Sequence, residues 1–347
     1  MPITEKDEYL IQQAADTVDL GENEDPDFMD RLYFGCHNPE GTLFLVAGLG
    51  TYPNINIMDG YVIVRQNDVQ HNLRLSRHLQ GDPATTRQGD PAITQLGPLS
   101  IKVIEPLKRW GVYLDDNDYG IGCSLEFEGR ISSYGEKAPQ ARYYGHYNQM
   151  GQYKGSITIG SQQFNVDGFV GARDRSRRRK QAGQGGAARG HFFVQVHFPG
   201  SYLTLVYAPL WDGTFHWCQG AILNDDGSEI SIVDMSHRIE FMPTVRALTR
   251  VEMLLKDANG KERHVTARPI SPAIYLNGGG YVHQGDDRGP FSIEGEQWDV
   301  SQPAGIDSPR FGFHEYIAEF QLDGATGVGI LEASFSPRQE DQYQPTL

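Results

Sequence analysis

The most distinctive chemistry in this sequence lies in four consecutive polar residues, Arg173-Asp-Arg-Ser176. They place two guanidinium groups, a carboxylate and a hydroxyl directly after residues 164–170, whose apolar side chains predict a buried strand. A carboxylate at such a strand end can be fixed by charge-assisted hydrogen bonds or presented to a ligand. From these residues alone, a structural Asp–Arg pair and a functional site are equally well supported.

A second polar segment, residues 143–150, precedes this cluster. Strand alternation places Tyr144, His146 and Asn148 on one face and Tyr147 and Gln149 on the other, so neither face suits a plain hydrophobic core. We expect this segment to cross a polar cavity or to lie at a domain junction. The His146 imidazole can give or take a proton near neutral pH, whereas a hydrogen-bonded structural histidine is the alternative.

Apart from the N-terminus, the chain has the pattern of short strands. Residues 5–19 repeat apolar side chains at helical spacing, with Thr4 as an N-cap, and predict a short helix. From residue 32 onward, short apolar or alternating runs are separated by Asn, Asp, Gly and Pro turn signals, which is typical of antiparallel barrels and sandwiches. The expected strands are 32–36, 42–47, 61–65, 69–75, 99–105, 108–114, 121–127, 154–159, 163–170, 191–198, 202–207, 214–220, 229–233, 236–241, 250–256, 262–268, 311–322 and 326–335.

Two of the later strands mix polar and aromatic side chains on one face. In residues 191–198 one face is apolar, while the other carries His191, Phe193, Gln195 and His197. Residues 214–220 place His216 and Cys218 on one side and Phe215 and Trp217 on the other. Such faces predict a barrel whose lumen is a half-polar cavity, and solvent exposure of the histidines is the alternative.

Composition limits the class of protein. At 347 residues the chain is long enough for two domains, and its net charge of −15 with a pI near 5.1 argues against nucleic acid or anionic membranes as partners. Three widely separated cysteines predict neither structural zinc nor a disulfide framework. No apolar run is long enough to cross a bilayer, and the acidic N-terminus lacks a signal-peptide pattern. We therefore expect a soluble, cytoplasmic protein without membrane insertion.

One low-complexity segment divides the chain. Residues 177–190 combine four consecutive basic residues with small, flexible ones, which predicts an exposed linker. The expected domains are an N-terminal helix and connector (1–29), a first barrel (30–176), this linker and a second barrel (191–347).

Signatures of the common cofactor enzymes do not occur: there is no GxGxxG, Walker loop, GxSxG or HExxH. The eleven histidines are too widely spaced to predict a metal site. The remaining possibilities are acid–base chemistry without a cofactor and binding without chemistry.

Several motifs resemble the tandem lipocalin-like superfamily of AttH-like proteins, carotenoid hydratases, kievitone hydratases and lipocalin-like Diels–Alderases. The matching motifs are Gly145-His-Tyr-Asn-Gln-Met-Gly151, Val166-Asp-Gly-Phe-Val-Gly-Ala-Arg-Asp-Arg-Ser176, Glu105-Pro-Leu-Lys-Arg-Trp110, Leu114-Asp-Asp-Asn117, Phe127-Glu-Gly-Arg130 and Gly324-Ala-Thr-Gly-Val-Gly-Ile-Leu-Glu332. The resemblance implies two calycin-type barrels packed together, with a ligand cavity in or between them. It also implies large apolar substrates, such as terpenoids or polyketides, that are hydrated or cyclised without a metal. Where relatives continue with Trp-Gly after the Ser, this chain has Arg177-Arg178.

The leading hypothesis is therefore a cofactor-independent lyase or isomerase, namely a hydratase, dehydratase or cyclase acting on a hydrophobic terpenoid, steroid or aromatic molecule. A non-catalytic carrier of such a molecule is the alternative, and the sequence leaves room for a homodimer. We expect Asp174, between two arginines, to stay ionised and act mainly as an organiser, which leaves His146 or Glu332 as the proton donor. The expected substrate-binding residues are Tyr144, Tyr147, Gln149, Arg173, His216 and Trp217.

Overall fold

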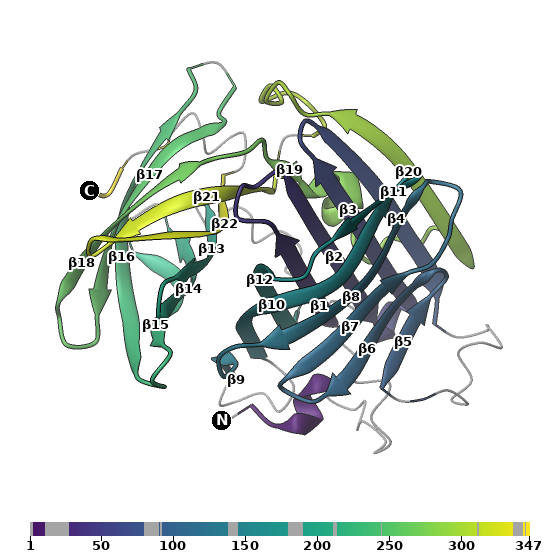
Figure 1. Cartoon of the computed structure of the whole chain (residues 1–347), viewed down its shortest axis with the longest axis horizontal. Helices are drawn as coiled ribbons and strands as arrows, with labels where there is room; N and C mark the ends of the chain where they lie inside the picture. The colour runs from purple at the N-terminus through teal and green to yellow at the C-terminus, as the bar shows by residue number, and fades with distance from the viewer. Residues whose placement is uncertain are drawn as a thin grey trace.

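The computed structural model describes residues 3–10, 28–79, 90, 92–137, 145–179, 190–210, 214–243, 245–310, 312–335, 343 and 345–347; the side chains of residues 136, 137, 178, 179 and 216 are not described. In these ranges the chain is almost entirely antiparallel β-structure, arranged as two packed sheets (Figure 1). The all-β tandem architecture expected from the sequence is confirmed.

The first sheet is a curled half-barrel. Thirteen described strands build it, in the order β20-β4-β3-β2-β1-β12-β10-β8-β7-β6-β5 with β9 and β11 paired to β10. Its strands are β1 (Phe28–His37), β2 (Leu43–Tyr52), β3 (Ile57–Gln66), β4 (Val69–His78), β5 (Ile93–Leu96), β6 (Leu99–Glu105), β7 (Arg109–Leu114), β8 (Ile121–Gly129), β9 (Tyr134–Lys137), β10 (Gly145–Ile159), β11 (Gln162–Asn165), β12 (Phe169–Arg179) and β20 (Phe291–Asp299).

The second sheet closes into a barrel of eight strands, because β18 pairs with both β17 and β21. Its strands are β13 (His191–Phe198), β14 (Ser201–Pro209), β15 (Phe215–Asn224), β16 (Glu229–Phe241), β17 (Leu248–Asp257), β18 (Glu262–Pro269), β21 (His314–Leu322) and β22 (Ala325–Ser334), and the two-residue β19 (Ile274–Tyr275) pairs at the edge of β21. Short 3-10 helices are η1 (Glu5–Glu8), η3 (Pro53–Ile55), η6 (Leu276–Gly279) and η7 (Tyr281–His283).

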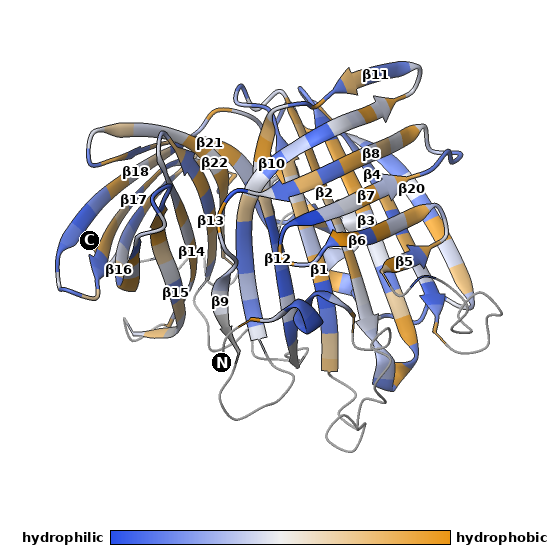
Figure 2. Cartoon of the chain, turned by 60° about the horizontal axis from the view of Figure 1, so that its bottom comes forward, coloured by the Kyte–Doolittle hydropathy of each residue, from blue (hydrophilic) through white to orange (hydrophobic). Residues whose placement is uncertain are grey.

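Strand alternation divides each sheet into an inner and an outer face, which Figure 2 shows as alternating colours along the strands. Side chains such as Phe34 and Trp110 fill the concave side of the first sheet, and Phe192 and Val194 fill the second barrel. A third apolar cluster, which includes Tyr33 and Phe193, lies between the two sheets. The polar and aromatic face of β13 therefore faces the first sheet. Our expectation that this face lines a half-polar lumen is wrong, because alternation defines two faces without saying which is inside.

The N-terminal segment packs against the concave side of the first sheet. Its helix spans only Glu5–Glu8, and Tyr9 returns to extended backbone, so the predicted helix of residues 5–19 is wrong at residues 9 and 10. Leu10 joins the first apolar cluster, and the Glu8 carboxylate is buried. Residues 11–27 lie outside the described residues.

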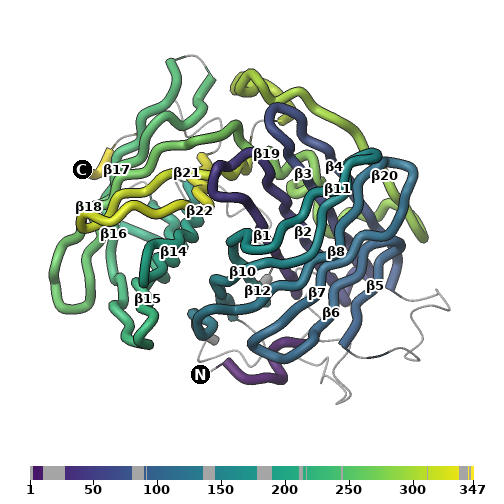
Figure 3. Tube along the Cα trace, in the orientation of Figure 1, coloured from purple at the N-terminus to yellow at the C-terminus, as the bar shows by residue number. Residues whose placement is uncertain are grey.

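The chain leaves the second barrel after β19 and returns at β21, and between them η6 and β20 contact the first sheet (Figure 3). Strand β20 pairs with β4, so the first sheet contains a strand from the C-terminal half. This strand was not predicted, and it crosses the expected boundary between the two barrels. Similarly, β12 extends to Arg179, into the expected linker, of which residues 180–189 lie outside the described part.

Within the described residues, no helix has the length and apolar character required to span a membrane.

Candidate functional site between the two sheets

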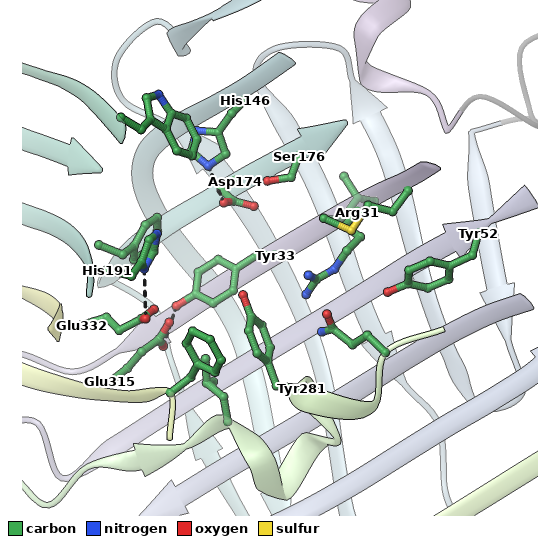
Figure 4. A pocket seen from close by; sticks show the side chains of 17 residues that line it. Arg31, Tyr33, Tyr52, His146, Asp174, Ser176, His191, Tyr281, Glu315 and Glu332 are labelled. Carbon is green, nitrogen blue, oxygen red and sulfur yellow. Dashed lines mark hydrogen bonds and ion pairs between the residues drawn. The ribbon is translucent and has the colours of Figure 1, made fainter. Parts of the chain in front are cut away.

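A cavity of about 330 Å³ lies between the outer face of the first sheet and the second barrel (Figure 4). The segment between β19 and β21 supplies its third wall. The lining side chains are Met29, Arg31, Leu32, Tyr33, Tyr52, His146, Asp174, Ser176, His191, Phe193, Trp217, Leu276, Tyr281, Gln284, Phe313, Glu315 and Glu332. Among the residues predicted for a site, His146, Asp174, Glu332 and Trp217 meet here.

Strand register explains how the first sheet assembles its part of the wall. Arg31 on β1 pairs with Ser176 on β12, which pairs with His146 on β10. In the next row of the same face, Tyr33 pairs with Asp174. Because side chains two residues apart share a face, these residues from three strands all point into the cavity.

His146 and Asp174 form a hydrogen-bonded pair within this wall. The His146 Nε2 atom lies 2.9 Å from the Asp174 Oδ2 atom, and the Trp217 ring packs edge-on against the imidazole at a centroid distance of 4.7 Å. The Gln219 side-chain amide approaches His146 Nδ1 at 3.5 Å, the outer limit of a hydrogen bond. Asp174 therefore has an imidazole as its partner and sits at the cavity surface.

The arginines on either side of Asp174 serve a different purpose from the one we expected. Arg173 and Arg175 point to the concave side of the sheet, where Arg173 binds Glu8 at 3.0 Å and Arg175 binds Asp30 at 2.7 Å. The predicted Asp174–arginine pairing is wrong, because neighbours in a strand face opposite sides of the sheet.

Three of the predicted substrate-binding residues belong to this concave side, away from the cavity. Arg173 donates to Gln149 at 2.8 Å, and the Tyr147 hydroxyl donates to Glu8 at 2.7 Å. Tyr147, Gln149 and Arg173 thus hold the N-terminal segment in place and do not line the cavity. Tyr144 lies outside the described residues, and so does the side chain of His216.

The second barrel contributes a pair of carboxyl groups that lie opposite each other on β21 and β22. Glu315 and Glu332 are register partners, and both are almost fully buried. The Tyr33 hydroxyl donates to Glu315 Oε2 at 2.8 Å, and His191 Nδ1 lies 3.1 Å from Glu332 Oε1. One carboxyl group therefore has a neutral partner, and the other has a partner that can carry a positive charge.

Burial raises the pKa of Glu315 well above its ordinary value, and the neighbouring carboxylates of Glu332 and Asp174 raise it further against the lowering effect of Tyr33. Desolvation penalises the charged form, and an adjacent negative charge does the same. The surroundings of Glu315 thus favour its neutral, protonated form.

Sequence reasoning missed Glu315. The available signal was its alternation with Tyr316, which places it on a face with Ile317, an unusual setting for a carboxylate. Its pairing with Glu332 depends on the register of β21 and β22, which no local pattern gives. Among the described residues, no group of three His, Cys, Asp or Glu side chains is arranged to hold a metal ion.

Solved proteins of low sequence identity share this fold. A protein assigned as AttH from Nitrosomonas europaea gives a TM-score of 0.61, with 14% identity over 90% of this chain and 94% of its own. CghA, solved with Sch210972, gives 0.54, with 12% identity over 90% and 89%. Kievitone hydratase from Nectria haematococca gives 0.48, with 10% identity over 93% and 94%, and this likeness is too distant to carry an argument.

These likenesses show a shared fold, which is the fold that the sequence resemblance implied. No curated protein matches the sequence. A sequence profile for a family of unknown function matches residues 3–340, almost the full length. The chain therefore belongs to the family of unknown function DUF8625.

Proposed function

We propose that this protein is a cofactor-independent enzyme that hydrates, dehydrates or cyclises an apolar small molecule by acid–base chemistry in the cavity between its two sheets. The observation that carries the proposal is the buried Glu315 carboxyl group, whose pKa is raised by burial, in the same cavity as two histidine-paired carboxylates. Titratable groups whose surroundings push their pKa values apart are the usual basis of an acid and base pair. The fold shared with CghA, which was solved with a bound small molecule, supports binding at such a cavity.

In a hydration, Glu315 donates its proton to one carbon of an alkene and leaves a cation on the other. A water molecule attacks that cation, and its surplus proton passes to the His146–Asp174 pair. Return of this proton to Glu315 through solvent completes the cycle, and dehydration is the reverse. The Glu332 carboxylate, held by His191, and the ring of Tyr33 stabilise the developing positive charge.

Water can be held next to this base. Asn148 on β10 is the register partner of Asp174, and its side chain is almost fully buried. Neither its amide nitrogen nor its oxygen has a hydrogen-bond partner within the described part of the chain. Buried polar groups without protein partners are generally satisfied by ordered water.

The test is turnover on a panel of terpenoid, steroid and polyketide alkenes and alcohols, followed by mass spectrometry in water enriched in the heavy oxygen isotope. We expect the wild-type protein to add or remove water, or to isomerise, at least one of these compounds. Glu315→Gln should lower kcat by about 100-fold or more, the usual contribution of a general acid. Glu319→Gln, exposed on the same strand, is the matched control. Binding of several compounds without turnover of any would instead identify a carrier protein.

The same assay separates the roles of the paired residues. We expect folded His146→Ala to lose turnover, with Asp174→Asn losing both turnover and stability, because Asp174 fixes the imidazole. Near-native turnover in His146→Ala, together with an inactive but normally stable Asp174→Asn, would show that the carboxylate is the base.

A further inference from the structure

The cavity has a second polar end that the proposed chemistry does not use. Arg31 on β1 extends its guanidinium into the cavity beside Tyr281, on the opposite side of Tyr33 from Glu315 in Figure 4. The guanidinium carbon lies 4.9 Å from the centroid of the Tyr281 ring. This stacking contact fixes the cation in position and leaves its N–H donors available.

Arg31 differs from the other buried arginines of this sheet. Arg173 and Arg175 each bind a buried carboxylate, whereas no carboxylate within the described residues lies at ion-pair distance from Arg31. Burial lowers the pKa of Arg31, but Tyr52, Tyr281, Tyr61 and Asp59 together raise it above its ordinary value, so the group stays charged. A half-buried cation without a paired anion is costly unless a ligand supplies that anion.

A neighbouring tyrosine points to the same conclusion. Tyr52 lines the cavity at 1% exposure, and no described residue meets its hydroxyl at hydrogen-bond geometry. Burial raises the pKa of Tyr52, and the nearby Asp59 carboxylate raises it further. Space for both side chains comes from Gly50 on β2, where a Cβ atom would lie 2.9 Å from Arg31 Cγ, 3.2 Å from the Tyr52 hydroxyl and 3.3 Å from Asp59 Oδ1. Gly50 thus leaves room for a guanidinium and a hydroxyl at this end of the cavity, with the Asp59 carboxylate beside them.

Resting on the function proposed above, we infer that the substrate is an apolar molecule with one anionic oxygen group, a carboxylate or an ionised enol, which Arg31 and Tyr52 bind while the reacting carbons lie beside Glu315. Planar guanidinium groups recognise such oxygens with two parallel hydrogen bonds. The carboxylates of Glu332 and Asp174 repel an anion from the other end, so the charged group also sets the direction in which the substrate enters.

A binding experiment tests this without knowledge of the substrate. The neutral dye N-phenyl-1-naphthylamine reports occupancy of the apolar cavity by its fluorescence, and 2-naphthoate and 2-naphthamide compete for it. These competitors have nearly the same shape and differ in charge. We expect naphthoate to compete at least about tenfold more strongly than naphthamide, as a charge-assisted hydrogen bond provides.

Arg31→Met should bring the naphthoate to naphthamide ratio close to one, and Arg31→Lys should give an intermediate ratio. Arg268→Met, which removes the same charge from an exposed site on β18, should leave the ratio unchanged. Leu276→Trp, which fills the cavity, should abolish dye binding and so locate the site.

The outcomes separate the two proposals. Dye binding with equal competition by the two compounds would overturn the anionic-substrate inference and leave the acid–base function standing. A preference for naphthoate that survives Arg31→Met would also overturn it. Failure of the wild-type protein to bind the dye would overturn the apolar cavity and both proposals with it.

Discussion

Replacing Glu315 by glutamine should stabilise the folded protein at neutral pH while removing its activity. In an unfolded chain a glutamic acid ionises near pH ~4.3. In the fold, burial raises the pKa of Glu315 well above that value, so the native state keeps a proton that the unfolded state has released. The contribution of Glu315 to the free energy of unfolding therefore falls as the pH rises from the pKa of the unfolded state towards the pKa of the folded state.

The size of the effect follows from the single proton involved. Each pH unit in which native Glu315 is protonated and unfolded Glu315 is ionised costs about 1.4 kcal/mol of unfolding free energy. Glutamine has the same shape, does not titrate, and keeps an oxygen to accept the Tyr33 hydrogen bond of 2.8 Å. The stability gained by Glu315→Gln over wild type should thus grow from nearly zero at about pH 4 by this amount per pH unit.

Urea unfolding between about pH 4 and about pH 8 measures this gain from the midpoint at constant slope m. Glu319→Gln on the same strand is exposed and should show no such trend. A Glu315→Gln protein that is less stable than wild type by a constant amount at every pH would refute the reasoning, because it would mean that the native carboxyl group is ionised and favourably paired.

Two further predictions concern stability away from the cavity. Glu8→Gln should lower the free energy of unfolding by about 3–5 kcal/mol, because it leaves Arg173 buried without its partner at 3.0 Å. Glu5 is exposed, so Glu5→Gln should leave that free energy unchanged. Urea unfolding measures both variants, and an unchanged stability of Glu8→Gln would contradict the buried network. Burial, the main cause, lowers the pKa of His37 to about 4 and that of His197 to about 3, so both histidines are neutral in the fold at neutral pH. In the unfolded chain each of them takes up a proton below about pH 6.5. The free energy of unfolding should therefore fall below that pH by about 1.4 kcal/mol per pH unit for each histidine. The substitution His197→Gln should reduce this slope by about 1.4 kcal/mol per pH unit, and an unchanged slope in unfolding measurements would count against it.

Local patterning predicted the elements well because each strand carries its own period of two. The alternating run at residues 191–198 forms β13, and the described part of the polar run, residues 145–150, belongs to β10 at the junction of the two sheets. Strand β20 escaped prediction because its sequence, Phe291-Ser-Ile-Glu-Gly-Glu-Gln-Trp-Asp299, is mostly polar and exposed. It adds to the edge of a sheet formed by the other half of the chain, which no local signal encodes.

Errors at the site came from treating neighbours in sequence as neighbours in space. Asp174 and Arg173 are adjacent in the chain, yet the strand turns them to opposite faces, one towards His146 and the other towards Glu8. His146 and Asp174, by contrast, are far apart in sequence and meet because β10 and β12 are antiparallel neighbours. The pairing of Glu315 with Glu332 could have been found only from the register of β21 against β22.

The placement of the cavity between the sheets explains why this chain needs both halves to form one site. The first sheet supplies Arg31, Tyr33 and the His146–Asp174 pair, while the second barrel supplies Glu315 and the His191–Glu332 pair. The Tyr33 hydrogen bond to Glu315 crosses the junction, so any shift of one sheet against the other alters the acid directly. Since each interior is already filled with apolar side chains, the junction is the place in the described structure where polar groups can gather around a ligand without disrupting a core. The tandem arrangement thus separates stability, which resides in the two interiors, from chemistry, which resides between them.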